Sequence, residues 1–427
     1  MEASEVFEEW NAYAKKKELL ARDFDFTPLV ENSRFKIVAI TGIRRAGKTS
    51  LLMLLAQQLA ARNEKVCYIN LEDSRIKDNE HILDEAIKWF GDSGFMLLDE
   101  VTSSEDWEGW LARTHELLKG KLRLIVSSSC KNLIWPSKPL RGRILHYELF
   151  PLSFKEFLHF KGVSIEKTTA GKGVVEKAFS EYLKYGGFPE VVLTREEIDK
   201  VRILNSYFKD IVGLDVAEVS KEDARVVETF GRYVIQSPYF SASKCLNFLK
   251  TLGHKIGKEK ILRLEHYSQA SYLFFFIPIF AYNIKDRSQY PRKAYCGDTG
   301  FVHSTTGKIE FGRLFENLAF LEMKRNYEQR EICYWKNKEG REVDFVVKDG
   351  TSVGEILQVV YDLEDEKTLK RELDAVVKCS EEFRVKNATI LTKDVAKTEE
   401  IGGVRVSFIP LINWLLTGYP GGGIHNL

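Results

Sequence analysis

Two short motifs near the N-terminus contain residue types that suit phosphate chemistry. The first fits the pattern GxxxxGK[ST] and lies between a predicted strand, residues 36–41, and a predicted helix. Its glycines let backbone N–H groups wrap a phosphate, and a helix N-terminus adds positive potential. We expect Lys48 to reach the β- and γ-phosphates and Thr49 to bind Mg²⁺. The residues of this candidate nucleotide loop are Gly42, Ile43, Arg44, Arg45, Ala46, Gly47, Lys48, Thr49 and Ser50.

The second motif is an apolar strand, residues 95–99, that ends in two neighbouring carboxylates. We expect Asp99 to hold Mg²⁺ through water and Glu100 to orient or polarise the attacking water. A buried strand that ends at a solvated acidic turn is the alternative, and the glycine motif upstream argues against it. Together the motifs predict ATP and Mg²⁺ as cofactors and ATP hydrolysis as the reaction.

Two further segments offer polar groups to the same chemistry. The predicted strand 121–127 leads into Ser127, Ser128 and Ser129, and ligands of parallel sheets bind at such carboxyl ends. A serine there would sense the γ-phosphate, with a plain serine-rich turn as the alternative. An arginine of the following run 140–143, for which we take Arg143, would stabilise transition-state charge in the same or a neighbouring subunit. A surface basic pair is the alternative.

The surrounding elements alternate between strand and helix up to about residue 151. This order implies parallel βαβ units and a three-layer α/β domain. Predicted helices dominate residues 153–217 and 222–270, and strands return from residue 292. The predicted strands of the first part span 36–41, 65–71, 95–99 and 121–127, and its predicted helices span 2–21, 49–61 and 107–118.

Composition excludes several classes of protein. Lys plus Arg number 63 and Asp plus Glu 62, so nucleic acid would have to bind a local patch instead of a generally basic surface. The longest apolar run, residues 272–282, is too short to span a bilayer, and we expect no membrane partner. The six cysteines show no CxxC pair and the N-terminus no signal-peptide pattern, so we expect a cytoplasmic protein.

These motifs together resemble a family of prokaryotic, often archaeal, AAA+-type P-loop ATPases. Further marks are PLSFKEFL (151–158), YLKYGGFPEVVL (182–193), YFKDIV (207–212) and YCGDTGFV (295–302). The resemblance implies that Lys48 and Thr49 bind ATP and Mg²⁺, that Asp99 and Glu100 run hydrolysis, and that Ser128 occupies the sensor position. It also implies that the ATPase is followed by a winged helix and a restriction-endonuclease-like domain.

The expected fold is therefore α/β, with a parallel P-loop NTPase sheet, a helical lid, a winged helix and a C-terminal α/β domain of the PD-(D/E)XK type. The expected divisions are an N-terminal helical segment 1–30, an AAA+ ATPase core 31–160, a helical lid 161–220, a winged helix-turn-helix 221–290, a PD-(D/E)XK-like domain 291–417 and a flexible tail 418–427.

Residues 241–270 predict two helices around a turn, as in a helix-turn-helix. The second helix carries Lys258, Lys260 and Arg263, which would contact DNA or RNA. A helical module used only for packing or partner contacts is the alternative, because Glu259 and Glu265 lie on the same helix.

The C-terminal part matches the PD-(D/E)XK pattern incompletely. Glu316 and Asp344 stand at two acid positions, but Gln358 replaces the second strand acid and Val360 replaces the lysine. An alternative register uses Glu355 as the acid and places Leu357 at the lysine position. Both registers lack the lysine, so we expect a nuclease-like fold with no or badly impaired cleavage.

Three functions remain open at this point. The first is an ATP-dependent switch or motor that acts on nucleic acid. The second is a nucleotide-controlled scaffold or signalling ATPase that acts on protein partners, and the third is an active ATP-regulated nuclease. A homo-oligomer is compatible with each of them.

Overall fold

The computed structural model describes residues 2–129, 138–283, 287, 290–307, 310–327, 330–350 and 352–417. The expected flexible tail, 418–427, lies outside the described residues. The chain forms two compact units, Met1–Pro151 with Ala270–Tyr272, and Leu152–Gln269 with Leu273–Leu427. The boundary between the two units falls after Pro151, because helix α6 (Phe154–Phe160) packs on α7 (Thr169–Tyr185) and α8 (Pro189–Leu193) of the second unit.

The first unit is built on a five-stranded sheet in the order β2-β3-β4-β1-β5. All neighbouring strands are parallel, and β1 to β4 are almost continuously buried, as expected for a sheet covered on both faces. The strands are β1 (Ile37–Thr41), β2 (Val66–Asn70), β3 (Gly94–Asp99), β4 (Leu122–Ser128) and β5 (Ile144–Glu148).

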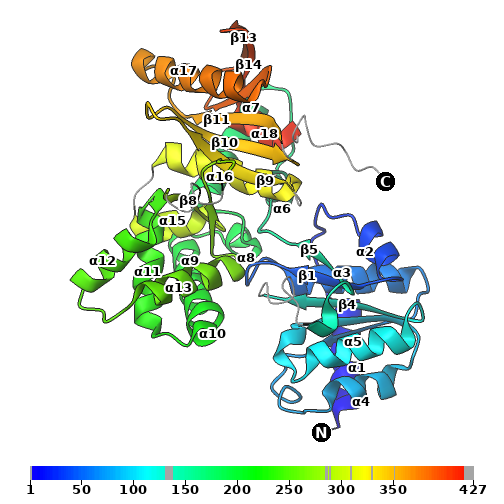
Figure 1. Ribbon diagram of the computed structural model, residues 1–427. Helices are drawn as coiled ribbons and strands as arrows, with labels where there is room; N and C mark the ends of the chain where they lie inside the picture. The colour runs from blue at the N-terminus through cyan, green and yellow to red at the C-terminus, as the bar shows by residue number, and fades with distance from the viewer. Residues whose placement is uncertain are drawn as a thin grey trace. The chain divides into compact units, whose positions relative to one another are not determined.

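Helices cover the two faces of this sheet (Figure 1). Val38 and Ile40 of β1 pack with the leucines of α3 (Lys48–Ala61), whereas the alternate residues Ile37 and Ala39 face the opposite cluster. That cluster contains α4 (Ile82–Phe90) and α5 (Trp107–Leu118). Two N-terminal helices, α1 (Ala3–Lys16) and α2 (Thr27–Asn32), complete the unit. Helix α1 ends before the expected residue 21, because the chain becomes extended at Lys17.

The second unit begins with a helical region. It comprises α6, α7 (Thr169–Tyr185), α8 (Pro189–Leu193), α9 (Glu197–Asp210), the π-helical turn η4 (Ile211–Ala217) and α10 (Glu218–Ser220). The buried carboxylate of Asp298 anchors it by accepting hydrogen bonds from Gly187 N and Gly300 N, each at 2.8 Å. A Cβ atom on Gly186 would lie 1.6 Å from Asp298 Oδ1, so this position requires glycine.

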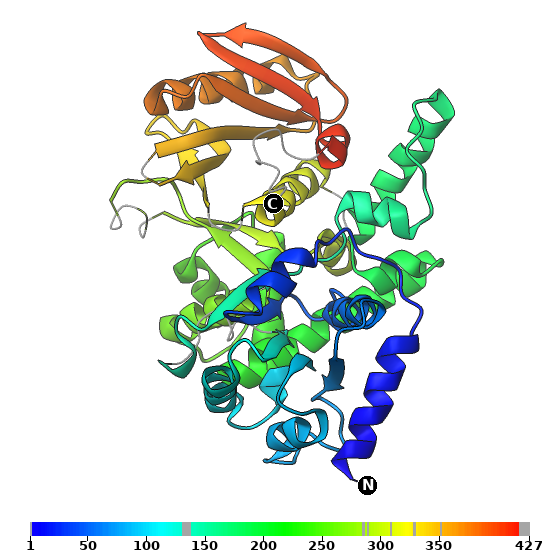
Figure 2. The ribbon, with the colours of Figure 1, turned by 90° about the vertical axis from the view of Figure 1, so that its right-hand side faces the viewer.

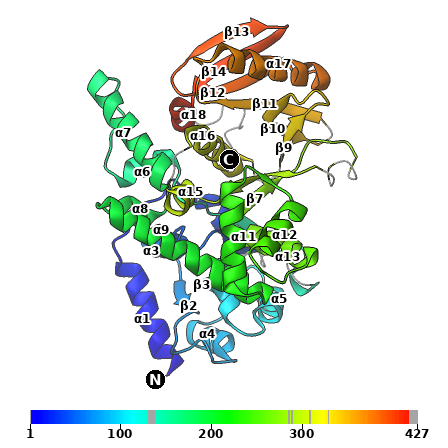
Figure 3. The same cartoon turned by 90° about the vertical axis from the view of Figure 1, so that its left-hand side faces the viewer.

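A region of helices and short strands follows. Its elements are α11 (Ala224–Gln236), β6 (Tyr239–Phe240), α12 (Ala242–Thr251), α13 (Lys258–Ala270), β7 (Phe274–Ile277) and β8 (Arg292–Cys296). The strands form an antiparallel sheet in the order β6-β8-β7, and Figure 3 shows α11, α12 and α13 gathered beside it. The apolar run 274–277 is the buried strand β7, so its phenylalanines form core.

The C-terminal part is a six-stranded mixed sheet in the order β13-β14-β12-β11-β10-β9. Helix α17 packs on one face against Val346, whereas Phe345 faces Phe320 of α16 on the other (Figures 1 and 2). The elements are α15 (Thr299–Thr306), α16 (Phe311–Asn326), β9 (Glu331–Lys336), β10 (Glu342–Asp349), β11 (Ser352–Val360), α17 (Glu366–Phe383), β12 (Asn387–Thr392), β13 (Lys397–Ile401), β14 (Val404–Pro410) and α18 (Leu411–Thr417). Over the described stretches, no helix combines the length and the hydrophobicity needed to cross a bilayer.

Candidate functional site

The glycine motif forms the loop between β1 and α3. Gly47 has a φ of +100°, in the left-handed region that glycine adopts without strain. A Cβ atom on Gly42 would lie 2.0 Å from the carbonyl oxygen of Leu149, so this position also requires glycine. Arg22 donates hydrogen bonds to Ala46 O at 2.9 Å and to Phe150 O at 3.1 Å. This arginine holds the loop against the segment after β5, and no local motif points to it.

Lys48 begins α3 and is only 4% exposed. Its Nζ atom donates to Gly42 O at 3.0 Å, to Ile43 O at 3.2 Å and to Ser129 Oγ at 2.8 Å. Glu100 Oε1 lies 3.8 Å away and supplies the nearby negative charge. The ammonium group is thus enclosed by the loop, where it can donate to the oxygens of an anion held by the same backbone.

Asp99 ends β3 and is almost fully buried. Its Oδ2 atom accepts a hydrogen bond from Tyr68 Oη at 2.8 Å, and its Oδ1 atom accepts one from Ser127 Oγ. Burial raises the pKa of Asp99, as does the charge of Glu100, while hydrogen bonds from Ser127, Thr49 and Tyr68 act in the opposite direction. The Thr49 hydroxyl and the Asp99 carboxylate are therefore neighbours, and such hard oxygen donors fit Mg²⁺.

Glu100 follows β3 with a φ of +50°, a rare backbone conformation for a residue other than glycine. Its carboxylate accepts hydrogen bonds from Ser129 N at 3.1 Å and Ser129 Oγ at 2.6 Å. Its own backbone N–H donates to Ser127 Oγ at 3.0 Å. The strand order places β4 between β1 and β3, so the serines at its end reach both motifs.

The structure therefore distinguishes the three serines. Successive strand residues face opposite sides, so Ser127 and Ser129 point the same way and Ser128 points the other way. Ser128 Oγ shares a 3.0 Å hydrogen bond with Thr102 Oγ1, whereas Ser129 contacts both Lys48 and Glu100. Ser129, and not the expected sensor Ser128, thus contacts the residues that were expected to bind and hydrolyse the nucleotide.

Arg143 is not brought to the loop within one chain. It precedes β5, and its carbonyl oxygen accepts a hydrogen bond from Ile37 N at the start of β1, whereas the loop follows the end of β1 at Thr41. Thr41 lies four residue steps beyond Ile37, which is about 13 Å along the strand at the usual rise per residue. Its guanidinium contacts Pro139 O at 3.0 Å and Glu116 Oε2 at 3.4 Å instead.

If Ser129 positions the reacting groups, Ser129→Ala will lower ATP turnover by about 10- to 100-fold, the usual worth of a hydrogen bond to a charged group. The matched variant Ser128→Ala removes the same hydroxyl from the neighbouring residue and should change turnover by only a few-fold. Steady-state phosphate release measures both variants. A larger loss for Ser128→Ala would restore Ser128 as the sensor.

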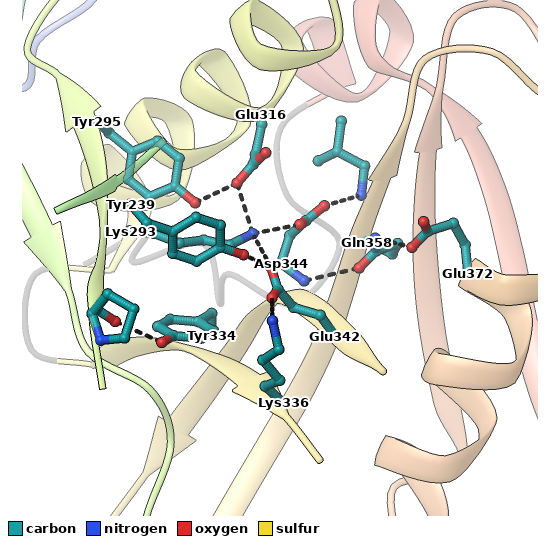
Figure 4. A network of polar contacts seen from close by, with 12 residues as sticks. Tyr239, Lys293, Tyr295, Glu316, Tyr334, Lys336, Glu342, Asp344, Gln358 and Glu372 are labelled. Carbon is teal, nitrogen blue, oxygen red and sulfur yellow. Dashed lines mark hydrogen bonds and ion pairs between the residues drawn. The ribbon is translucent and has the colours of Figure 1, made fainter. Parts of the chain in front are cut away.

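A second polar cluster lies in the C-terminal half of the chain (Figure 4). Lys293 of β8 points its Nζ atom at three carboxylates, Glu316 Oε1 at 3.0 Å, Asp344 Oδ1 at 2.6 Å and Glu342 Oε1 at 3.1 Å. Burial alone would lower the pKa of Lys293, but attraction by Asp344 and then Glu316 raises it well above its ordinary value. The sequence did not predict Lys293, because it lies in a different region of the chain from the acids, and it assigned no role to Glu342, although this residue lies on the same strand as Asp344.

Of the remaining residues of the incomplete nuclease pattern, Gln358 lies beside the acidic cluster, whereas Val360, Glu355 and Leu357 have other surroundings. Gln358 is beside Asp344, whose backbone N–H donates to Gln358 Oε1 at 2.8 Å, and its Nε2 atom donates to Glu372 Oε2 at 2.7 Å. Val360 is buried in the core under α17. Glu355 of the alternative register pairs instead with Arg330, at 2.9 Å, and with Tyr327, and Leu357 is buried.

Two of the basic residues of α13 pair with an acidic residue. Lys260 Nζ lies 2.8 Å from Glu222 Oε2, and Arg263 Nη2 lies 2.7 Å from Glu222 Oε1. The two cationic side chains remain 46% and 47% exposed, while Glu222 is nearly buried. One carboxylate thus offsets half of the charge that these two residues carry.

The parallel sheet, the glycine loop and the acidic strand end define an AAA-type P-loop ATPase domain. A family model described as an AAA domain matches residues 34–158. Two models described as domains of unknown function, DUF8612 and DUF4143, match residues 176–310 and 311–359.

The chain belongs to the family that includes MJ1544 of Methanocaldococcus jannaschii, a protein described as uncharacterized. The two are 30% identical over 422 residues, which cover 95% of this chain and 92% of MJ1544. An uncharacterized protein of Haemophilus influenzae is 24% identical over 396 residues, 89% of this chain and 94% of that protein.

Solved structures with local similarity include DnaA from Aquifex aeolicus bound to AMPPCP. It is 16% identical, covers 61% of this chain and 98% of its own, and has a TM-score of 0.28. A DNA replication initiation factor is 17% identical, covers 49% of this chain and 76% of its own, and has a TM-score of 0.26. Similarity at these TM-scores says nothing about the activity of this chain.

Proposed function

We propose that this protein binds ATP with Mg²⁺ at the candidate nucleotide loop and hydrolyses it. The observation that carries the proposal is the convergence of Lys48, Thr49, Asp99, Glu100 and Ser129 at one edge of a parallel sheet. These residues come from the ends of two neighbouring strands, β3 and β4, and from helix α3 after the loop, and ligands of such sheets bind at this edge.

Each group has a role that follows from its contacts. Lys48 exchanges the carbonyl oxygens of Gly42 and Ile43 for phosphate oxygens when the nucleotide binds. Thr49 and Asp99 would hold Mg²⁺, and the ion would supply charge neutralisation at the phosphates. Glu100 orients the attacking water and accepts its proton, and Ser129 fixes the Glu100 carboxylate. Arg143 contributes only if a second copy of the chain presents it.

Equilibrium binding of ATP to the purified chain tests the first half of this proposal. ATP should bind more tightly with Mg²⁺ than with EDTA, because the Thr49 hydroxyl and, through water, the Asp99 carboxylate would help to hold the metal. Equal binding under both conditions would contradict the assignment of Thr49 and Asp99.

For the second unit we propose a winged-helix module that engages nucleic acid. The supporting observation is the element order α11-β6-α12-α13-β7-β8 with the sheet order β6-β8-β7, which leaves α13 with exposed cationic side chains. ATP binding and hydrolysis would then switch the engagement of nucleic acid. A scaffold or signalling ATPase that acts on protein partners is the second candidate, favoured by the pairing of Lys260 and Arg263 with Glu222.

Glu222→Gln separates these two candidates. If α13 contacts nucleic acid, removing the shared carboxylate frees cationic charge, so duplex DNA should bind several-fold more tightly and with a steeper salt dependence. Glu218→Gln, at an exposed residue in the same unit, is the matched control. Fluorescence anisotropy at several salt concentrations measures both effects. Unchanged binding in Glu222→Gln would favour the protein-directed candidate.

A further inference from the structure

The resemblance to PD-(D/E)XK nucleases implies a divalent metal ion held between Glu316 and Asp344. The donor set here does not fit that ion. The two carboxylates already share Lys293 Nζ, at 3.0 and 2.6 Å, and the amide of Gln358 stands where a further acid ligand is needed. An ammonium group and a divalent cation cannot occupy the same point between these oxygens.

The hydrogen-bond count supports this reading. An ammonium group has three N–H donors, and Lys293 lies within reach of three carboxylates, the third being Glu342 at 3.1 Å. With its donors engaged by these acids, the amine has none to spare for polarising a water or a phosphate. Lys293 is thus unsuited to stand in for the lysine missing at Val360, although it is the cation nearest the acids.

The carboxylates also accept hydrogen bonds from groups other than Lys293 (Figure 4). Tyr295 Oη donates to Glu316 Oε1 at 2.6 Å, and Tyr239 Oη donates to Glu342. Val359 N donates to Asp344 Oδ2 at 2.9 Å, and Lys336 Nζ lies 3.1 Å from Glu342 Oε2. Buried charges of this kind are tolerated when they are paired and hydrogen-bonded, and Lys293 together with Lys336 supplies the pairing here.

We propose that the Lys293 ammonium is a built-in counter-cation that occupies the divalent-metal position of this nuclease-like domain. The domain consequently binds no Mg²⁺ there and cleaves no phosphodiester. The lysine lies on β8 and Tyr239 on β6, so the same contacts join the β6-β8-β7 sheet to the C-terminal sheet. This inference is independent of the ATP site and survives if ATP hydrolysis is disproved.

The test replaces Lys293 by methionine, which keeps length and removes charge. Mn²⁺ binding to the full chain without nucleotide is measured by electron paramagnetic resonance. Lys293→Met should gain one Mn²⁺ per chain relative to the wild type, and the double variant Lys293→Met with Asp344→Asn should lose it. A folded Lys293→Met variant that gains no Mn²⁺ would overturn the proposal.

Two further measurements keep the test decisive if Lys293→Met is unstable. Mn²⁺ should raise the melting temperature of Lys293→Met more than that of the wild type, because the ion replaces the lost charge. An equal effect on both proteins would count against the proposal. In the wild type, Asp344→Asn should leave Mn²⁺ binding unchanged. Loss of a wild-type Mn²⁺ site in Asp344→Asn, or Mg²⁺-dependent DNA cleavage that this change abolishes, would also overturn it.

Discussion

Glu100→Gln should lower the rate of ATP turnover by about 10²- to 10⁴-fold, the usual contribution of a positioned general base. The amide keeps the shape of the side chain and can still accept a hydrogen bond from Ser129, but it cannot take a proton from water. ATP binding should persist, because Lys48 and the backbone of the loop are untouched. Steady-state phosphate release gives the turnover, and equilibrium dialysis gives the binding.

Glu105→Gln is the matched control, because Glu105 is exposed and undergoes the same chemical change. It should retain wild-type turnover. If Glu100→Gln hydrolyses ATP as fast as this control, Glu100 does not activate water and another acid must be sought.

Lys48→Ala should weaken ATP binding by about 10²- to 10³-fold. Each charge-assisted hydrogen bond from the ammonium to a phosphate oxygen contributes about 1.5–3 kcal/mol, and more than one is lost. Turnover at sub-saturating ATP should fall at least as far. Isothermal titration calorimetry measures the affinity, and circular dichroism checks that the variant remains folded.

Lys77→Ala removes an exposed lysine from the same unit and should bind ATP like the wild type. Full ATP affinity in a folded Lys48→Ala variant would show that the nucleotide binds elsewhere. ATP affinity is measured in addition to turnover because Lys48 also contacts Ser129 and lies near Glu100. Removal of Lys48 therefore also disturbs the two residues that position the attacking water.

The ATPase domain was predictable because its signals are local. The glycine loop and the acidic strand end are each contiguous in sequence, and strands alternating with helices impose a parallel order that brings their ends together. What sequence could not decide was which serine faces inward, since a shift of one residue reverses the face of a strand. The contacts of Ser129 with Lys48 and Glu100 become visible only once the strand is in register.

Other features depend on contacts between distant parts of the chain. Arg22 contacts the loop from a segment that contains no motif. Arg143 is close to Ser128 in sequence, but it lies beside the start of β1, the end of the strand opposite to the loop. The lysine of the carboxylate cluster comes from β8, more than fifty residues before Asp344. The nuclease pattern expects a lysine two residues after the acid position on β11, and the two possible registers place Val360 and Leu357 there.

The measurement that tests the central claim most directly is single-turnover hydrolysis of radiolabelled ATP with the protein in excess. Under these conditions product release and partner proteins do not limit the reaction. The wild type should convert bound ATP to ADP when Mg²⁺ is present and leave it intact in EDTA, and Glu100→Gln should hold ATP unchanged. Conversion at the same rate in the wild type and Glu100→Gln, or intact ATP on the wild type with Mg²⁺, would contradict it.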